Sequence, residues 1–238
     1  MNRLKLKNTI NLIRKMIQYN FRIIFGGRFI WFLLAAFAFF AFVAITAVWN
    51  GEVPDEEFVY GILIFPAMLL IFYPMTFGIQ NDLDAGILEI LFGIPDYRYK
   101  VWLVRLVLVF VLVFLLLLAF AGVSSIFLTP VNLVEIARQL MFPVLFLGSL
   151  AFMFSTIIKN GNGTAVVMVI LGVVLLIFSD ALQRTYWNVF LNPLSVPRNM
   201  NEVVWEGIVL KNRIFLIVGT LLFTLYGLFN LQKREKFI

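Results

Sequence analysis

Long, uninterrupted runs of apolar residues are the feature that most constrains this chain. A helix that crosses the hydrocarbon core of a bilayer needs about 20 mostly apolar residues, because each residue adds about 1.5 Å along the axis. Such runs lack the alternating pattern of a lipid-facing barrel strand, so they predict helices. The sequence therefore predicts an all-α membrane protein with six transmembrane helices, at about residues 29–49, 58–79, 101–128, 139–158, 164–179 and 214–231.

The overall composition excludes several other classes of protein. Hydrophobic residues make up 62% of the 238 residues and charged residues only 13%, whereas a soluble domain has about 25% charged residues. The net charge of +6 is spread between apolar segments, which disfavours binding to nucleic acid. The chain has no His and no Cys, so it offers no imidazole base, no thiolate nucleophile and no disulfide.

The distribution of Lys and Arg predicts how the helices are oriented. Basic residues are concentrated before the first predicted span, between the second and third, between the fourth and fifth, and after the sixth. If every span crosses the membrane, these four segments lie on one side of it and the remaining connections lie on the other side. Segments rich in Lys and Arg generally stay in the cytoplasm. We therefore expect a protein of the bacterial cytoplasmic membrane with both termini in the cytoplasm.

Two segments outside the spans have patterns of their own. Residues 1–28 carry apolar side chains at helical spacing, from Leu6 to Ile24, with basic and amide side chains opposite them. This pattern predicts an amphipathic helix in the cytoplasmic interface, followed by one membrane domain at residues 29–238. Residues 180–213 mix apolar and polar residues with two prolines, and we expect short re-entrant helices there, on the outer side.

The predicted spans carry almost no ionisable groups. Arg105 lies near the start of the third span, where a long side chain can reach the interface, and Arg213 lies just before the sixth. Ion-coupled carriers and intramembrane hydrolases generally need ionisable groups at mid-depth. The chain also lacks a phosphate-cradling loop. If this protein does directed work, we expect the energy to come from a partner.

The connection between the second and third spans is the most informative loop. Asn81 is expected to cap a short helix, with Asp82 and Asp84 in its first turn. Apolar residues from Leu83 to Ile94 would share one face of this helix, which ends at Pro95. The pattern predicts an amphipathic helix on the cytoplasmic surface, joined directly to two membrane helices.

This loop resembles the signature of the membrane subunits of ABC exporters of the second type (the ABC-2 type). The matching residues are Gly86, Leu88, Glu89, Leu91 and Pro95, followed by the basic residues Arg98 and Arg105. Ile87 stands where the family usually has Thr, and Arg105 where it usually has Lys. The layout of interfacial helix, six spans and short outer helices is similar to that family over nearly the whole chain.

The resemblance implies a permease subunit of an ATP-driven exporter rather than an enzyme. A separate ABC ATPase subunit would dock on residues 81–100, with contacts from Asp82, Asp84, Glu89 and Arg98. ATP and magnesium would bind that partner, and this chain would hold no cofactor or metal. Two permease copies, or this chain and a homologous permease, would enclose a pathway lined mainly by the first, second and fifth spans.

Other interpretations of the same residues stay open. Plain helix capping would explain Asp82 and Asp84 equally well. The ATPase could dock on a membrane anchor that transports nothing. A lipid-modifying enzyme with magnesium at Asp82 and Asp84 is a third hypothesis, although such a site needs more acidic groups than one loop supplies. Uncharged spans favour a hydrophobic or amphipathic cargo, such as a drug, a peptide antibiotic or a lipid, over a small ion.

Overall fold

The chain folds into a bundle of long helices. The computed structural model describes residues 29–51, 53–84, 86, 98–197 and 200–231, and in these ranges it contains helices and turns but no strand. The helices are α2 (Phe29–Trp49), α3 (Glu56–Asp84), the π-helix η1 (Arg98–Leu103), α5 (Val104–Phe127), α6 (Leu133–Ile158), α7 (Gly161–Ala181) and α8 (Glu202–Asn230).

Six of these segments are long and apolar enough to cross a membrane, with η1 and α5 together forming the third. They coincide with the six predicted spans, and most of them extend further than predicted. The additional turns carry polar residues, such as Glu56 and Asp84 in α3, which a hydropathy pattern places outside a span. The prediction of an all-α protein with six candidate spans is confirmed.

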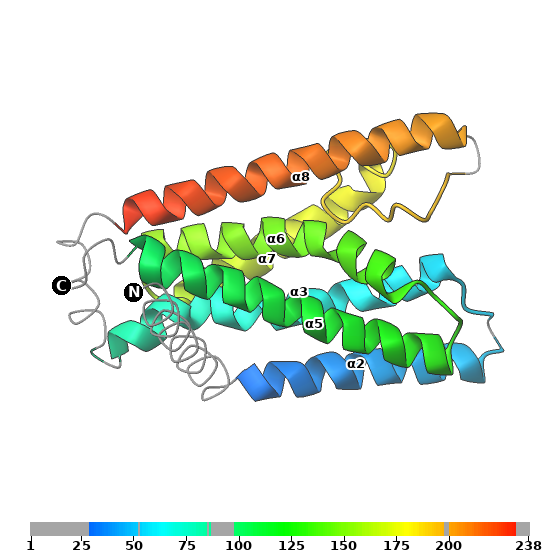
Figure 1. Ribbon diagram of the computed structural model, residues 1–238, viewed down its shortest axis with the longest axis horizontal. Coiled ribbons are helices and arrows are strands. Elements are labelled where there is room, and N and C mark those ends of the chain that lie inside the picture. The colour runs from blue at the N-terminus through cyan, green and yellow to red at the C-terminus, as the bar shows by residue number, and fades with distance from the viewer. Residues whose placement is uncertain (1–28, 52, 85, 87–97, 198–199, 232–238) are drawn as a thin grey trace, which may run out of the picture.

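The six spans alternate in direction along the bundle (Figure 1). The left end of the bundle in Figure 1 contains the start of α2, the end of α3, the entry into α5 through η1 and the end of α8. We call this end the loop end. The opposite end, where α3 and α8 begin, we call the far end. Helices α3 and α6 form the centre of the bundle, α2 packs along α3, and α8 packs along α6.

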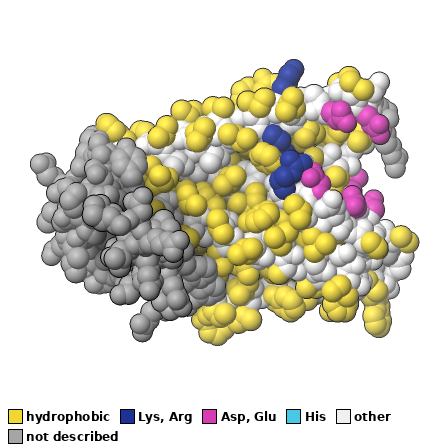
Figure 2. Space-filling view, viewed as in Figure 1, with side chains coloured by type: hydrophobic (Ala, Val, Ile, Leu, Met, Phe, Trp, Pro, Cys, Tyr) yellow, Lys and Arg dark blue, Asp and Glu magenta, His cyan; other side chains and the backbone are white. Residues whose placement is uncertain are grey.

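The surface of the bundle is largely apolar. Figure 2 shows hydrophobic side chains over most of the face that the described residues form, with Lys and Arg side chains near its middle and Asp and Glu side chains toward the far end. Large apolar residues on α2, α7 and α8 are exposed, including Phe42, Ile177 and Leu222. Because a soluble monomer rarely exposes contiguous apolar surface of this extent, the surface suits contact with lipid.

Asparagine side chains cap three of the helices. The side-chain oxygens of Asn132, Asn160 and Asn201 accept hydrogen bonds from the first turns of α6, α7 and α8. Between α6 and α7, Lys159 adopts a positive φ of 61°, which ends α6 and lets Asn160 begin the next helix at once. The turn at the loop end between these two helices is therefore very short.

Two predicted segments have different outcomes. The amphipathic helix at residues 1–28 lies outside the described residues. The short re-entrant helices expected in 180–213 are not confirmed: residues 182–197 form turns, and α8 begins at Glu202. The early start has a local cause, because Asn201 caps the helix and the buried Trp205 donates a hydrogen bond to the Pro193 carbonyl at 2.9 Å.

Candidate functional site

The predicted docking loop is described only in part. Asp82 and Asp84 belong to the last turn of α3, Gly86 follows it, and the backbone of Arg98 begins η1. The remaining predicted site residues, Leu88, Glu89, Leu91 and Pro95, lie outside the described residues. The structure thus fixes the two ends of the loop and the helices that carry them.

The first end of the loop differs from the sequence-based expectation. Helix α3 continues through Asn81 to Asp84, so Asn81 does not cap a new helix, and its amide instead donates to the Tyr73 hydroxyl at 3.3 Å. Gly86 has a positive φ of 65°, and its N–H donates to the Leu83 carbonyl at 3.0 Å. A left-handed residue of this kind commonly ends a helix, which explains why α3 stops here.

The two aspartates of this turn have opposite environments. Asp84 is exposed, whereas Asp82 is only 3% exposed and points into the bundle. Its carboxylate accepts a hydrogen bond from Arg105 Nη1 at 2.6 Å, in an ion pair that links α3 to the first turn of α5. Of the two aspartates, Asp82 thus faces Arg105 inside the bundle and Asp84 lies at the surface.

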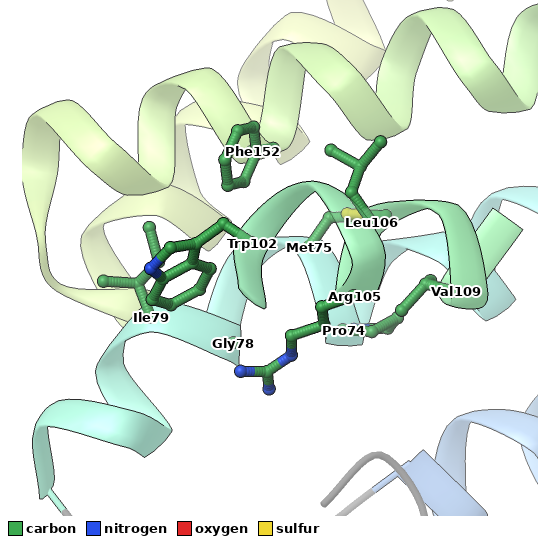
Figure 3. Close-up of a pocket in the computed structure, with 9 residues that line it drawn as sticks. All are labelled: Pro74, Met75, Gly78, Ile79, Trp102, Arg105, Leu106, Val109 and Phe152. Atoms are coloured by element: carbon green, nitrogen blue, oxygen red, sulfur yellow. The ribbon is translucent and has the colours of Figure 1, made fainter. Parts of the chain in front are cut away.

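Arg105 is also buried, at 8% exposure, and its side chain turns toward α3. Its guanidinium lies against Gly78 on α3, with 3.6 Å between Arg105 Nη2 and the place where a Cβ would be. The guanidinium also lies over the Trp102 ring, 5.6 Å from the centroid. Figure 3 shows Arg105 extending toward Gly78, with Trp102 beside Ile79.

A small cavity of about 20 Å³ lies in this cluster, between Trp102, Arg105 and Phe152. The buried Trp102 Nε1 faces no hydrogen-bond acceptor among the described residues. The cavity is far too small for a cargo molecule, since ligand pockets usually measure about 300–1,000 Å³. The cluster is a packed joint between α3, η1, α5 and α6 rather than a binding site.

Further polar contacts tie the loop end together. The Gln80 side chain accepts a hydrogen bond from the Gly161 N–H at the start of α7. Ser155 on α6 donates to the Thr76 carbonyl on α3 at 3.2 Å, and Asn230 on α8 donates to the Thr156 carbonyl at 2.7 Å. The end of α3 is thus fixed to α6 and α7, and the end of α8 is fixed to α6.

A larger, almost wholly apolar cavity of about 430 Å³ lies among the helices and opens to the surface of the bundle, where lining residues such as Phe65 and Leu176 are exposed. Its walls come from α2, α3, α6 and α7, together with Phe190. The lining includes Phe32 of α2, Met68 and Phe72 of α3, and Gly172 of α7. A cavity with this lining can hold an apolar group but offers nothing to coordinate an ion.

A second buried arginine organises the far end. Arg213 on α8 is 6% exposed and donates from Nε to the Gln139 side chain at 3.0 Å and from Nη1 to the Asn212 side chain at 2.9 Å. Its guanidinium lies over the Phe142 ring at 4.9 Å. Nη2 has no hydrogen-bond partner among the described residues. The sequence-based analysis placed Arg213 at an outer end but missed its burial.

No family model, no curated protein and no solved structure matches this chain. In the part of the chain that the structure describes, no three potential metal-ligating carboxylates come together. The function must accordingly be inferred from the residues themselves.

Proposed function

We propose that this protein is the permease subunit of an ATP-driven exporter, moved by a separate ABC ATPase subunit that docks on residues 81–100. The observation that carries the proposal is the buried Asp82–Arg105 ion pair, which joins the two helices that flank this loop. The resemblance of Gly86, Leu88, Glu89, Leu91, Pro95 and Arg98 to the ABC-2 type signature supports the same conclusion.

The ion pair gives the loop a direct mechanical connection to the bundle. A force applied to a loop between two independent helices would bend the loop or shift one helix alone. Here the last turn of α3 and the first turn of α5 are held by a charged contact of 2.6 Å, and Gln80 fixes α3 to the start of α7. Since packed helices move as rigid elements, a push on residues 85–97 is transmitted to α3, α5 and α7 together.

The buried charges support the proposal of an external source of energy. Among the described residues, the buried ionisable side chains with a formal charge are Asp82, Arg105 and Arg213. The first two neutralise each other, and Arg213 is surrounded by amides, a phenyl ring and the buried Tyr60 side chain. None of these groups is arranged to take up and release a transported proton or sodium ion, so a partner that hydrolyses ATP supplies the work.

The apolar cavity indicates the class of cargo. It lies between α2, α3, α6 and α7. Of these helices, α2, α3 and α7 correspond to the first, second and fifth spans, which the resemblance associates with the pathway. Its lining favours an acyl chain, a drug or an apolar peptide side chain over a polar solute. We propose a hydrophobic or amphipathic substrate that leaves the cell through a pathway between this chain and a second permease subunit.

The remaining parts of the proposal concern segments outside the described residues or their place in the cell. We propose here the interfacial helix predicted for residues 1–28, a coupling helix in the loop 81–100, and a position of both termini in the cytoplasm of a bacterial cell. The loop end then faces the cytoplasm, where an ATPase subunit can reach it.

Two other functions fit fewer observations. A non-transporting anchor would use the same docking loop but has no need for a cavity of about 430 Å³ between the spans. A lipid-modifying enzyme with magnesium at Asp82 and Asp84 is disfavoured, because the Asp82 carboxylate is bound to Arg105 while Asp84 points to the surface.

A charge reversal in the loop tests the proposal. The wild-type protein, purified in mild detergent from its native membrane, is expected to carry an ATP-binding subunit in stoichiometric amount, and Glu89→Arg should lose it. Glu206→Arg makes the same charge change on an exposed residue at the far end and should keep the subunit. Retention of the ATP-binding subunit by Glu89→Arg, or its absence from the wild type, would contradict the proposal.

A variant that fills the apolar cavity distinguishes an exporter from a non-transporting anchor. Gly172→Phe fills it without touching the loop, since nothing lies within 4 Å of a Cβ at Gly172. An exporter with this variant should keep its ATPase subunit but lose the stimulation of ATP hydrolysis by hydrophobic compounds. An anchor would show no such stimulation in the wild type.

A further inference from the structure

A groove on the outside of α8 combines apolar and cationic features. It measures about 760 Å³ and runs along one face of α8 over Phe146 of α6. At the far end it is bordered by Tyr186 and Trp187 from the turn segment 182–197. The residues that α8 contributes are Lys211, Ile214, Phe215, Val218, Gly219, Leu222 and Phe223.

The floor of the groove is rigid and aromatic. The Phe146 ring lies 5.5 Å from that of Phe215 and 5.3 Å from that of Phe223, measured between centroids. It lies so close to Gly219 that a Cβ there would be 2.4 Å from Phe146 Cε2. Since only glycine allows this approach, the sequence keeps the phenyl ring at the bottom of the groove.

The aromatic border is fixed beside Lys211 by the next residue of α8. Asn212 donates hydrogen bonds to the Tyr186 carbonyl at 2.9 Å and to the Asn188 carbonyl at 2.8 Å. The Tyr186 and Trp187 rings pack together at 4.6 Å, and Trp187 packs edge-on against Phe215 at 5.0 Å. The border is therefore held in place in the folded protein.

Lys211 lies at the same end of the groove and is exposed. Among the residues that the structure describes, no carboxylate pairs with its ammonium group. Tyr and Trp side chains favour the level of the lipid headgroups, and a basic residue at that level attracts anionic headgroups. Beyond this end the lining is entirely apolar, from Ile214 to Phe223.

We propose that the α8 groove binds an anionic phospholipid, with the headgroup phosphate at Lys211 and an acyl chain along Phe215, Phe146 and Phe223. One end of the groove matches a negative charge at an interface, and the other end matches a hydrocarbon chain. A second copy of the protein fits this face poorly, because a two-fold axis along the membrane normal would bring the two Lys211 side chains toward each other. This site is separate from the proposed cargo cavity and does not depend on transport.

The test compares two lipids that differ in headgroup charge only. The full-length protein in nanodiscs is titrated with phosphatidylglycerol and with phosphatidylcholine of the same acyl chains, and bound lipid is counted by native mass spectrometry. We expect the wild type to favour phosphatidylglycerol by about fivefold, corresponding to about 1 kcal/mol for one lysine at an anionic surface. Lys211→Gln should bring this ratio close to one.

Arg184→Gln is the matched control, because it removes an exposed cation at the same end that does not line the groove. It should keep the preference for phosphatidylglycerol. Val218→Trp, which fills the groove, should reduce the binding of both lipids. Equal binding of the two lipids by the wild type, an unchanged ratio in Lys211→Gln, or the same loss in Arg184→Gln would overturn the proposal.

A photoreactive side chain at Leu222, which is 60% exposed, gives an independent readout. Adducts with phospholipid, enriched for phosphatidylglycerol and reduced by Lys211→Gln, would support the site. A covalent dimer of the protein in place of a lipid adduct would show that a second copy covers the groove and would contradict the proposal.

Discussion

The two buried arginines of this protein lie at opposite ends of the bundle and are stabilised in different ways. Arg105, at the loop end, forms an ion pair with Asp82, so the two charges cancel within the joint between α3 and α5. Arg213, at the far end, is held by the neutral side chains of Gln139 and Asn212 and by the face of Phe142. Removal of one partner of a buried ion pair leaves the other charge without a counterion, whereas removal of a cation among amides leaves no buried charge behind. The loop end thus depends on two charges that balance each other, and the far end on a network of neutral polar side chains that also holds the turn segment 182–197.

The largest effect is expected from breaking the ion pair on one side. Arg105→Met leaves the Asp82 carboxylate buried without a counterion, and loss of one partner of a buried pair costs about 3–5 kcal/mol. The free energy of unfolding, measured by denaturant titration in detergent, should fall by that amount. Adding Asp82→Leu should restore most of the stability, since both charges are then gone. A loss of less than about 1 kcal/mol in the single variant would show that the pair does not hold the joint.

A smaller loss is expected at the polar centre of the far end. Asn212→Leu keeps the volume of the side chain but removes the hydrogen bonds to the Tyr186 and Asn188 carbonyls and to Arg213. Buried polar groups left without partners cost about 1–3 kcal/mol, so we expect a decrease of about 2–3 kcal/mol. Asn230→Leu, which removes the bond to the Thr156 carbonyl at the loop end, should cost about 1 kcal/mol by the same assay. An equal decrease in the free energy of unfolding for Asn212→Leu and Asn230→Leu would contradict the larger contribution expected from Asn212.

Arg213→Met sharpens the comparison with Arg105→Met, because the chemical change is identical. Removing Arg213 leaves no carboxylate unpaired and eliminates a buried cation whose Nη2 has no partner among the described residues. The Gln139 and Asn212 side-chain oxygens lose a donor, so we expect the free energy of unfolding to fall by about 1–2 kcal/mol, less than in Arg105→Met. A loss as large as that of Arg105→Met would mean that the far end depends on its charge just as the loop end does.

The smallest effect is expected for the surface pair of α6. Glu135 and Arg138 are joined at 2.6 Å, but their side chains are 40% and 57% exposed. Exposed pairs one helical turn apart contribute about 0.3–0.5 kcal/mol, so Arg138→Gln should change stability by less than about 0.5 kcal/mol. Increasing the salt concentration should reduce this difference further. A salt-independent loss above 1 kcal/mol would place Arg138 in the buried network around Arg213.

The sequence was sufficient to predict the six candidate spans, because bilayer thickness and the rise of a helix translate apolar length directly into a span. It misplaced the end of α3, since the charge at Asp82 suggested a surface turn although the side chain is buried. The partner of Asp82 is Arg105, and nothing in the spacing of these two residues indicates that they meet. Similarly, the early start of α8 depends on Asn201 and on the contact between Trp205 and Pro193, which no hydropathy pattern contains.

The candidate site was predictable only where local sequence determines it. The resemblance identified the loop, but it could not distinguish Asp84, which is exposed, from Asp82, which is not. The apolar cavity and the α8 groove were not predicted, because both are formed by residues from three or more separate segments. For the burial of Arg213, the sequence offered one signal, a basic residue directly before an apolar span. The burial became clear only from the packing of Gln139 and Phe142 around its guanidinium.

The most direct test of the central claim places a photoreactive side chain at position 84, the exposed end of α3, in the intact cell. Position 206, exposed at the other end of the bundle, serves as the control. If the loop is the docking site, illumination should link position 84, and not position 206, to a protein with a phosphate-cradling ATP-binding loop. An absence of that adduct at position 84, or its formation at position 206 instead, would contradict the account.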